Sequence, residues 1–536
     1  MSSIIVRCTK MAAIKETMPK DQQLLSFVTS SFLERNVLLN IDSVPAVVRQ
    51  THIICTIGPA SREVDMLSKL MDVGMNICRL NFSHGSYDYH AGTVQNIREA
   101  ASRRPKGSVI AIALDTKGPE IRTGVLEGGA TAEVNLDTGS SLTVTVNDSF
   151  REKCSAQTLW VDYKKMIQVL SVGNLIYVDD GLISLKVTEK GSDYLKCIVV
   201  NGGKLGSKKG CNLPNTPIDL PAVSGKDKQD LLFGLDQNVD MVFASFIQDG
   251  NGIREIRQVL GQNGRHIQII AKIESFEGIR SFPDILKECD GVMVARGDMG
   301  IEIPPEKVFI AQKYLISACN MFGKPVICAT QMLESMTSKP RATRAESNDV
   351  ANAVLDGADC VMLSGESAKG LYPIEAVMHM SSVCLEAESV FHSRHMFGEL
   401  RRVNIPSVDP THSLAISTVA ASYTCMAAAI IVITESGRAA HLVSRYKPRC
   451  PIVMVTHNES VAKQSLLYRG VNPIYVPSTD NNWQNDMNVL VLEALGFCHL
   501  KELNKHNEPI LLLIGLVNGS DQSNCLQVIT SKPKSK

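Results

Sequence analysis

A short apolar run that ends in polar side chains and leads into a helix-like stretch recurs eight times between residues 52 and 366. The β-branched residues of these runs predict strands, and strands separated by helices predict a parallel sheet buried on both faces. Eight such units favour closure into a (β/α)8 barrel, the TIM-barrel fold. The predicted strands are His52 to Thr56, Met75 to Leu80, Ser108 to Leu114, Asp240 to Ala244, Ile267 to Ala271, Gly291 to Ala295, Pro325 to Ala329 and Cys360 to Leu363.

The spacing of the runs is interrupted once, between Asp115 and Asp240, where alternating Thr, Val and Leu with glycine turns predict a small all-β insert. Pro119 and Pro221 predict stiff hinges, so we expect the insert to act as a lid over the barrel mouth. After residue 392, strands alternate with helices again, which predicts an open α/β domain. The predicted parts are an N-terminal segment 1–45, a barrel of 46–118 and 221–391, a lid of 119–220 and a C-terminal domain of 392–536.

Composition excludes several classes of function. The chain has 55 Lys and Arg residues and 55 Asp and Glu residues, so it carries no net positive charge that would favour binding to nucleic acid or to an anionic membrane surface. The longest apolar stretch, Met426 to Ile433, is far short of the roughly 20 residues that a membrane span needs. The 15 cysteines contain no Cys-x-x-Cys pair, which predicts reduced thiols and a cytoplasmic location. A weak transit signal in the first 20 residues stays an open alternative.

Each strand run ends in polar side chains, and sites in barrels are built at this carboxyl end. Lys272 and Glu274 end the fifth run and share a face, because alternate residues of a strand point the same way. Asp298 follows the sixth run. Two carboxylates are suited to bind Mg²⁺ or Mn²⁺, with a phosphorylated substrate as a further ligand of the ion. The lysine can stabilise the negative charge that develops on a phosphoryl group during transfer. A surface ion network is the alternative.

The ends of the second and third runs predict further ionic contacts. The positively charged side chain of Arg79 is suited to bind a phosphate group. A set of amide, hydroxyl and carboxylate oxygens carries little charge and matches a monovalent cation better than Mg²⁺; its members are Asn81, Ser83, Asp115 and Thr116. Ordinary turn and cap roles are the alternative for these four residues.

The lid and the last two runs add candidates. Arg122 at the lid entry and Lys209 in the basic turn 206–210 are predicted to reach a bound nucleotide, with a solvated loop as the alternative for the turn. Thr330 and Ser364 end the seventh and eighth runs. Their hydroxyls can pass a proton, or can cap the next helix.

Five longer motifs, in their order along the chain, resemble the pyruvate kinase family: Arg79 to Gly85, Leu114 to Thr123, Ile269 to Glu274, Met293 to Glu302 and Cys328 to Met336. The likeness runs from about residue 45 through nearly the whole chain. Long motifs in a fixed order are far more specific than a lone glycine signature. The resemblance implies a barrel, a lid and a C domain in a homotetramer. Its reaction would convert phosphoenolpyruvate and ADP to pyruvate and ATP, with Mg²⁺ (or Mn²⁺) and K⁺.

The resemblance also implies a role for each matching residue. Lys272 would stabilise the transferring phosphoryl group, Glu274 and Asp298 would hold Mg²⁺, and Thr330 would help to protonate the enolate. The substrate pocket would be formed by Arg79, Lys272, Gly297, Asp298 and Thr330. The nucleotide would be met by Asn81, His84, Arg122 and Lys209, and K⁺ by Asn81, Ser83, Asp115 and Thr116.

The C domain departs from activated members of the family, which bind fructose 1,6-bisphosphate there. Leu490 stands where an arginine is expected, and Glu435 sits beside the expected phosphate loop. The loop from Gly515 to Ser520 has neither tryptophan nor arginine, although Thr434, Ser436 and Trp483 are present. We expect weak or absent activation by this sugar bisphosphate, and we interpret Ser436 as a helix cap.

Two other functions fit less of the sequence. Another barrel enzyme that acts on phosphoenolpyruvate or pyruvate, such as a lyase or a dikinase domain, would not need the lid insert with its basic turn. A catalytically silent relative with a role in assembly or regulation would not need the intact catalytic and cation positions.

Overall fold

The eight predicted runs form a closed barrel of parallel strands, which confirms the predicted fold class. The strands follow one another round the barrel in chain order, each hydrogen-bonded to the next. Their bounds are β1 His52–Thr56, β2 Met75–Asn81, β3 Ala111–Asp115, β13 Met241–Ala244, β14 Gln268–Ile273, β15 Gly291–Ala295, β16 Val326–Ala329 and β17 Cys360–Leu363.

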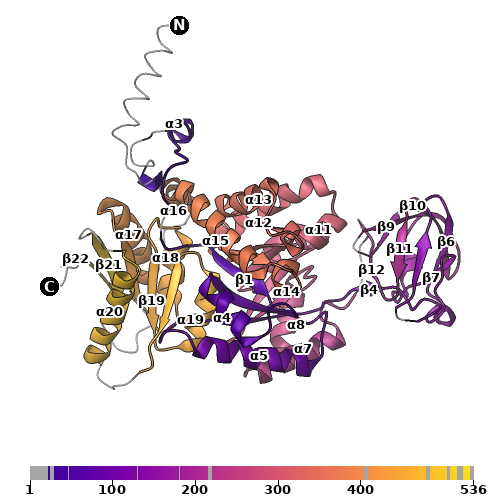
Figure 1. The fold of residues 1–536 in the computed structure, drawn as a ribbon, viewed down its shortest axis with the longest axis horizontal. Coiled ribbons are helices and arrows are strands. Elements are labelled where there is room, and N and C mark those ends of the chain that lie inside the picture. The colour runs from indigo at the N-terminus through magenta and orange to yellow at the C-terminus, as the bar shows by residue number, and fades with distance from the viewer. Residues whose placement is uncertain are drawn as a thin grey trace, which may run out of the picture.

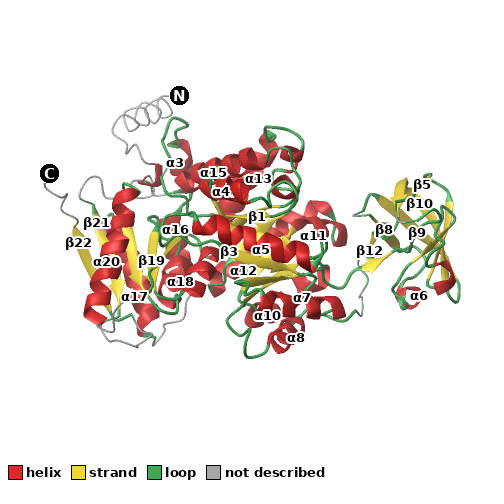
Figure 2. Ribbon diagram, turned by 60° about the horizontal axis from the view of Figure 1, so that its bottom comes forward, coloured by secondary structure: helices red, strands yellow, loops and turns green. Residues whose placement is uncertain are grey.

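This computed structural model describes residues 22–24, 29, 31–45, 47–129, 131–179, 181–214, 216, 220–403, 409–478, 483–503, 508–515 and 523–530. The barrel lies at the centre, with the inserted sheet on one side and the C-terminal sheet on the other (Figure 1). Figure 2 shows the barrel strands enclosed by helices. Ahead of the barrel lie the short helices η1 Gln22–Leu24 and α3 Phe32–Val37.

Some of the barrel helices begin at side-chain caps that the local sequence supplies. Ser86 accepts a hydrogen bond from the backbone of α5, and Ser224 and Thr343 form capping boxes at α7 and α13. The barrel helices are α4 Val64–Asp72, α5 Tyr87–Ser102, α7 Gly225–Asp236, α8 Gly250–Leu260, α9 Phe276–Arg280, α10 Phe282–Glu288, α11 Arg296–Glu302, η3 Pro305–Lys307, α12 Val308–Phe322, η4 Glu334–Thr337, α13 Arg344–Asp356, α14 Gly365–Ala368 and α15 Pro373–Val390.

Three aspartates fix the amino-terminal end of the barrel. Asp240, Asp290 and Asp359 immediately precede β13, β15 and β17, and each accepts a hydrogen bond from a backbone N–H of the preceding strand, at 2.7, 2.7 and 3.0 Å. Burial raises the pKa of Asp240 to about 6. Each carboxylate satisfies a backbone donor that the parallel ladder leaves open at the start of a strand.

The insert, called the lid below, is an independent β domain with its own apolar core. A seven-stranded sheet in the order β4-β12-β8-β9-β10-β6-β7 packs with a two-stranded sheet of β11 and β5. The bounds of its elements are β4 Ile121–Arg122, β5 Glu133–Leu136, β6 Ser141–Thr145, η2 Asp148–Phe150, β7 Thr158–Trp160, α6 Met166–Val169, β8 Leu175–Val178, β9 Ile183–Lys190, β10 Tyr194–Asn201, β11 Gly203–Gly206 and β12 Gly210–Asn212. In Figure 1 the lid stands apart from the barrel helices.

The C-terminal sheet has the order β20-β19-β18-β21-β22, with every pair parallel except the last. The antiparallel edge strand β22 was not predicted, because a strand near the end of the chain with no following helix does not repeat the alternating pattern. The elements are α16 Ser393–Val403, α17 Pro410–Thr424, β18 Ala429–Ile433, α18 Arg438–Arg445, β19 Ile452–Thr456, α19 Glu459–Gln464, η5 Ser465–Leu467, β20 Val471–Tyr475, α20 Trp483–Leu500, β21 Pro509–Ile514 and β22 Cys525–Thr530.

The C-terminal part closes the amino-terminal end of the barrel with η5. Leu466 and Leu467 join the apolar cluster inside the barrel, where they pack with residues such as Phe243. The carbonyl of Leu466 lies 2.6 Å from Nδ1 of His52, at the start of β1. The polar site at the opposite end is therefore the open end of the barrel.

Leu467→Ala should destabilise the protein by about 2 to 5 kcal/mol, because it removes a fully buried side chain and leaves a cavity inside the barrel. The measurement is the midpoint of chemical denaturation followed by circular dichroism. Leu492→Ala is the matched control, since Leu492 is 67% exposed. Equal midpoints for the two variants would show that η5 does not contribute to the barrel core.

Candidate active site

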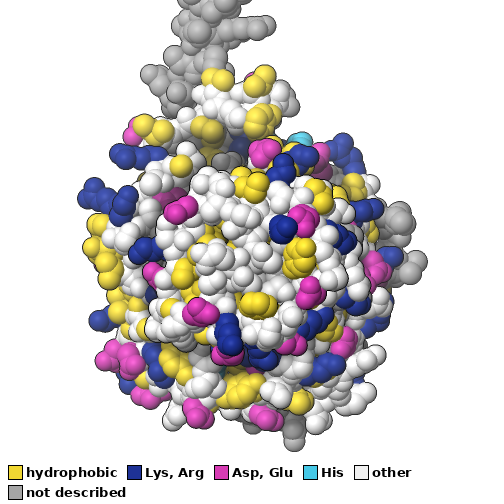
Figure 3. Space-filling model, turned by 90° about the vertical axis from the view of Figure 1, so that its right-hand side faces the viewer, with side chains coloured by type: hydrophobic (Ala, Val, Ile, Leu, Met, Phe, Trp, Pro, Cys, Tyr) yellow, Lys and Arg dark blue, Asp and Glu magenta, His cyan; other side chains and the backbone are white. Residues whose placement is uncertain are grey.

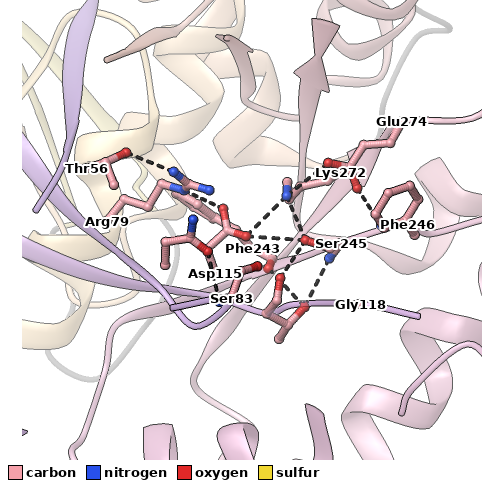
Figure 4. A network of polar contacts seen from close by, with 12 residues as sticks. Thr56, Arg79, Ser83, Asp115, Gly118, Phe243, Ser245, Phe246, Lys272 and Glu274 are labelled. Carbon is pink, nitrogen blue, oxygen red and sulfur yellow. Dashed lines mark hydrogen bonds and ion pairs between the residues drawn. The ribbon is translucent and has the colours of Figure 1, made fainter. Parts of the chain in front are cut away.

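The carboxyl ends of the barrel strands bring most of the predicted site residues to one rim. Lys272 is the centre of this cluster: its Nζ lies 2.6 Å from Ser245 Oγ, 3.2 Å from Asp115 Oδ1 and 3.0 Å from Glu274 Oε1 (Figure 4). All four side chains are buried. Burial alone would lower the pKa of Lys272, but Asp115 and Glu274 outweigh burial and raise the pKa above its ordinary value. Lys272 is therefore a fixed positive charge.

Arg79 extends the cluster on its other side. Its Nε pairs with Asp115 Oδ2 at 2.5 Å, and its Nη1 donates to Thr56 Oγ1 at 2.9 Å. Burial would raise the pKa of Asp115, but Arg79 and Lys272 outweigh burial and hold the pKa below its ordinary value. Asp115 therefore stays ionised between two cations, and both cations are held at the barrel mouth.

The two carboxylate oxygens of Glu274 face different neighbours. Its Oε2 accepts a hydrogen bond of 2.6 Å from the backbone N–H of Phe246, whose φ of 55° is left-handed. Its Oε1 is buried and accepts no hydrogen bond, since Lys272 approaches it in the geometry of an ion pair only. A buried carboxylate oxygen without a hydrogen bond is suited to a cation.

Gly297, Asp298 and Thr330 line an open pocket of about 670 Å³ at the ends of the next two strands, β15 and β16. Gly297 and Asp298 belong to the first turn of α11, and Thr330 follows β16 directly. Thr330 has a φ of 74°, a strained left-handed conformation for a β-branched residue. A Cβ on Gly297 would lie 2.7 Å from Thr330 Cγ2, so the close packing of this wall requires glycine.

An ion pair that the sequence did not reveal supports the strained turn. Arg296 donates to the carbonyl of Thr330 at 2.8 Å and to that of Ala329 at 3.2 Å. The same guanidinium makes two hydrogen bonds to Asp349 of α13, at 2.6 and 2.7 Å. Arg296 is one of the polar residues at the end of the sixth predicted run, with no partner evident from the sequence, and Asp349 lies on a helix with an ordinary amphipathic sequence.

The four residues predicted to hold a monovalent cation lie on two adjacent strand ends. Asn81 pairs in register with Asp115 in the β2–β3 ladder. Asn81 Oδ1 accepts from the backbone of Ser83 at 3.1 Å, and Thr116 Oγ1 accepts from the backbone of Ser245 at 3.1 Å. The ladder places the four residues at neighbouring strand ends, and the two side-chain contacts are turn contacts of the kind that the alternative interpretation expects.

Ser245 is the functional residue that sequence reasoning missed. It directly follows the fourth predicted run, from Asp240 to Ala244, where the sequence pattern assigns it no role. Its hydroxyl donates to the carbonyl of Thr116 at 2.6 Å, so its lone pairs are left to accept from Lys272. The signal that could have found it is its place at a strand end beside Lys272.

The lid residues lie outside this cluster and have their own ionic partners. Arg122 pairs with Glu120, with Nε 2.8 Å from Oε2, and Lys209 Nζ lies 3.0 Å from Asp179 Oδ1. The strands β4 and β12 place Arg122 opposite Gly210, next to Lys209. His84 is exposed on the loop before α5. The structure therefore brings the two lid cations together, but not against Lys272.

The interpretation of Ser436 as a helix cap needs correction. The N-cap of α18 is Gly437, and Gly437 donates its N–H to Thr434 Oγ1 at 3.2 Å. Ser436 Oγ does accept a hydrogen bond of 3.4 Å from the N–H of Arg438, the first residue of α18, but it does so from the position before the N-cap, because the left-handed Gly437 starts the helix one residue later. Leu490 is buried in the C-terminal core. The side chain of Trp483 and residues 516–520 lie outside the described residues.

Two general features of the molecule are its surface charge and the apolar length of its helices. On the face that Figure 3 shows, basic and acidic side chains are interspersed. Within the described residues, no helix is both long and apolar enough to cross a membrane.

Gly297→Ala should reduce the rate of the expected phosphoryl transfer by about 100-fold, because the new Cβ displaces Thr330 by a large part of 1 Å. The measurement is kcat in a coupled assay of pyruvate formation, with circular dichroism to confirm folding. Gly300→Ala is the matched control in the same helix, since a Cβ there meets its nearest atom, Val308 Cγ2, at 3.6 Å. Equal activity of the two variants would contradict the role of this wall.

Comparison with known proteins adds to this geometry. The family model "Pyruvate kinase, barrel domain" matches residues 48–377, and "Pyruvate kinase, alpha/beta domain" matches residues 412–529. The chain is 50% identical to the pyruvate kinases PKLR of Rattus norvegicus and Homo sapiens over 520 residues, which cover 95% of the chain and 90% of each relative.

A pyruvate kinase of Schizosaccharomyces pombe is 48% identical over 495 residues, which cover 91% of the chain and 96% of that protein. The two matching domain models, the closed barrel and the sequence identities all indicate the same family. The chain therefore belongs to the pyruvate kinase family and is a phosphotransferase of that kind.

Proposed function

We propose that the chain transfers the phosphoryl group of phosphoenolpyruvate to ADP at the buried Lys272 cluster. The observation that carries this proposal is a lysine held charged between two carboxylates at the open end of the barrel. A fixed cation there stabilises the charge that develops on the oxygens of a phosphoryl group in transfer. Arg79, 2.5 Å from the shared Asp115, adds a second cation for the phosphate of the substrate.

We assign Mg²⁺, or Mn²⁺, to Glu274 and Asp298. The donors fit such an ion: Glu274 Oε1 is a buried carboxylate oxygen without a hydrogen bond, and carboxylates are the hard ligands that Mg²⁺ prefers. Within the described part of the chain, no three His, Cys, Asp or Glu side chains gather into a complete cage. Water and substrate oxygens would fill the remaining positions, and an ion held there would contribute positive charge beside the phosphoryl group.

We assign K⁺ to the oxygens of Asn81, Ser83, Asp115 and Thr116. The set carries one negative charge, and Arg79 and Lys272 already balance it. A weakly charged site of amide and hydroxyl oxygens suits a large monovalent cation better than a small divalent one.

The pocket formed by Gly297, Asp298 and Thr330 is the proposed seat of the three-carbon part of the substrate. The hydroxyl of Thr330 would help to protonate the enolate that remains after transfer, directly or through water. Its strained backbone supports this role, because such strain is kept at functional sites where the surrounding structure enforces it.

The nucleotide would lie between the rim and the lid. His84 and Asn81 belong to the rim, and Arg122 and Lys209 to the lid, in the proposed domain of residues 119–220. The ion pairs of the two lid cations with Glu120 and Asp179 would be exchanged for contacts with the phosphates of ADP as the lid closes at Pro119 and Pro221.

We further propose a homotetramer in the cytoplasm. The apolar side chains of Phe309, Ile310 and Tyr314 on α12 are exposed in the single chain, which supports burial against another copy. The described cysteines are unpaired and nearly all buried, as suits a reducing compartment. A catalytically silent relative would not need the Lys272 cluster, whose buried charges are costly to maintain.

Lys272→Met should lower kcat by at least about 100-fold, because it removes a preorganised charge that acts on the transferring group. The measurement is a coupled assay of ADP-dependent pyruvate formation, with Mg²⁺ and with or without K⁺. Lys228→Met is the control, since Lys228 forms only a partly exposed ion pair with Glu255. Activity that persists in Lys272→Met, or that does not respond to Mg²⁺, would overturn the assignment.

Fructose 1,6-bisphosphate should leave the half-saturating concentration of phosphoenolpyruvate almost unchanged. The side chain of Leu490 is buried among apolar neighbours and carries no charge for a phosphate. Typical effectors shift affinity by about fivefold or more, so a shift of that size would show that the C domain binds the sugar bisphosphate after all.

A further inference from the structure

Glu302 stands out because it is buried and acidic but has no role in the proposed chemistry. It is the last residue of α11, and 8% of its surface is exposed. Burial raises the pKa of Glu302. A desolvated carboxylate is costly unless a contact compensates it, so its partner is informative.

The partner of Glu302 is in the lid. Asn212 Nδ2 donates to Glu302 Oε1 at 3.1 Å. Asn212 ends β12, three residues after Lys209, and β12 pairs with β4 so that Gly210 lies opposite Arg122. The contact therefore holds the strand pair that carries both lid cations.

Glu302 and Asn212 meet across a gap between the lid and the barrel. On one side an open pocket of about 470 Å³ separates β8 of the lid from the end of α11 and η3. On the other side the two residues line a smaller cavity with Pro119 and Leu220, close to the two hinges. Because open space lies around this contact, the hydrogen bond between Asn212 and Glu302 is a directional link between the lid and the barrel close to the hinges.

The barrel end of the contact is tied to the metal site. Asp298 lies four residues before Glu302 in α11, so the two carboxylates share one face of a helix of 7 residues. The helix fixes the distance between the proposed Mg²⁺ ligand and the point where the lid is held. The position of the lid therefore depends on the same helix that carries Asp298, the residue that would hold the ion beside the transferring group.

We infer that Glu302 is a positioning residue that, through Asn212, sets the lid so that Arg122 and Lys209 meet the nucleotide above Asp298. This inference rests on the proposed function, because it takes ADP to bind between the lid and the rim. A purely structural Glu302, needed only to complete α11 or to fill the gap, is the competing explanation.

Steady-state kinetics of the full-length chain separate these explanations. The variants are Glu302→Ala, Asn212→Ala, the double variant, and Glu302→Gln, whose amide oxygen can still accept from Asn212. Asn212→Ala leaves α11 unaltered, so it stays informative if Glu302→Ala does not fold.

We expect Asn212→Ala and Glu302→Ala each to raise KM for ADP by about tenfold, within the range that a hydrogen bond to a charged group is worth. KM for phosphoenolpyruvate should stay at its original value in Asn212→Ala. The double variant should be no worse than the more damaged single variant, because both remove the same contact. Glu302→Gln should recover most of the affinity for ADP.

Additive effects, an equal rise of both KM values in Asn212→Ala, or a Glu302→Gln variant as poor as Glu302→Ala would each overturn the inference. Amide hydrogen exchange gives a second readout: both alanine variants should lose protection in β12 but not in β10, inside the lid sheet. If the unaltered chain forms no pyruvate from phosphoenolpyruvate and ADP, the proposed function fails instead.

Discussion

The structure depends on an alternating row of buried charges at the barrel mouth. Arg79, Asp115, Lys272 and Glu274 come from three different strands, and each charge lies within 3.2 Å of the next. The row is neutral as a whole, which is the condition under which buried charges are tolerated. Removal of one member leaves a buried charge without a partner, which destabilises a protein by about 3 to 5 kcal/mol. The charged residues of the site therefore also stabilise the relative positions of the barrel strands that carry them.

The two ends of the barrel divide stability and chemistry between them. At the amino-terminal end, aspartates such as Asp359 accept backbone hydrogen bonds, and Leu466 and Leu467 fill the interior. The carboxyl end keeps an open pocket, a carboxylate oxygen without a hydrogen bond and the strained Thr330. A barrel rigid at one end can hold such unfavourable groups in place at the other.

The sequence could predict the features that each strand determines by itself, such as its position in the chain and the polar residues at its end. The eight runs and their polar ends follow from strand period and chain order, so the positions of Lys272, Glu274 and Asp298 at strand ends are predictable from the sequence. Pairings between distant elements could not be predicted. Asp349 reaches Arg296 from a helix 53 residues later, and Leu467 enters the barrel from another domain. Neither has a local pattern that differs from an ordinary helix or turn.

The lid shows why position, more than charge, should govern nucleotide binding. Arg122 and Lys209 already have carboxylate partners in Glu120 and Asp179, so ADP would replace one set of anions with another. Such an exchange yields little net electrostatic free energy in a partly exposed site. What distinguishes the bound state is then the alignment of the cations with the phosphates. A hydrogen bond that fixes the lid angle, as between Asn212 and Glu302, contributes directly to that alignment.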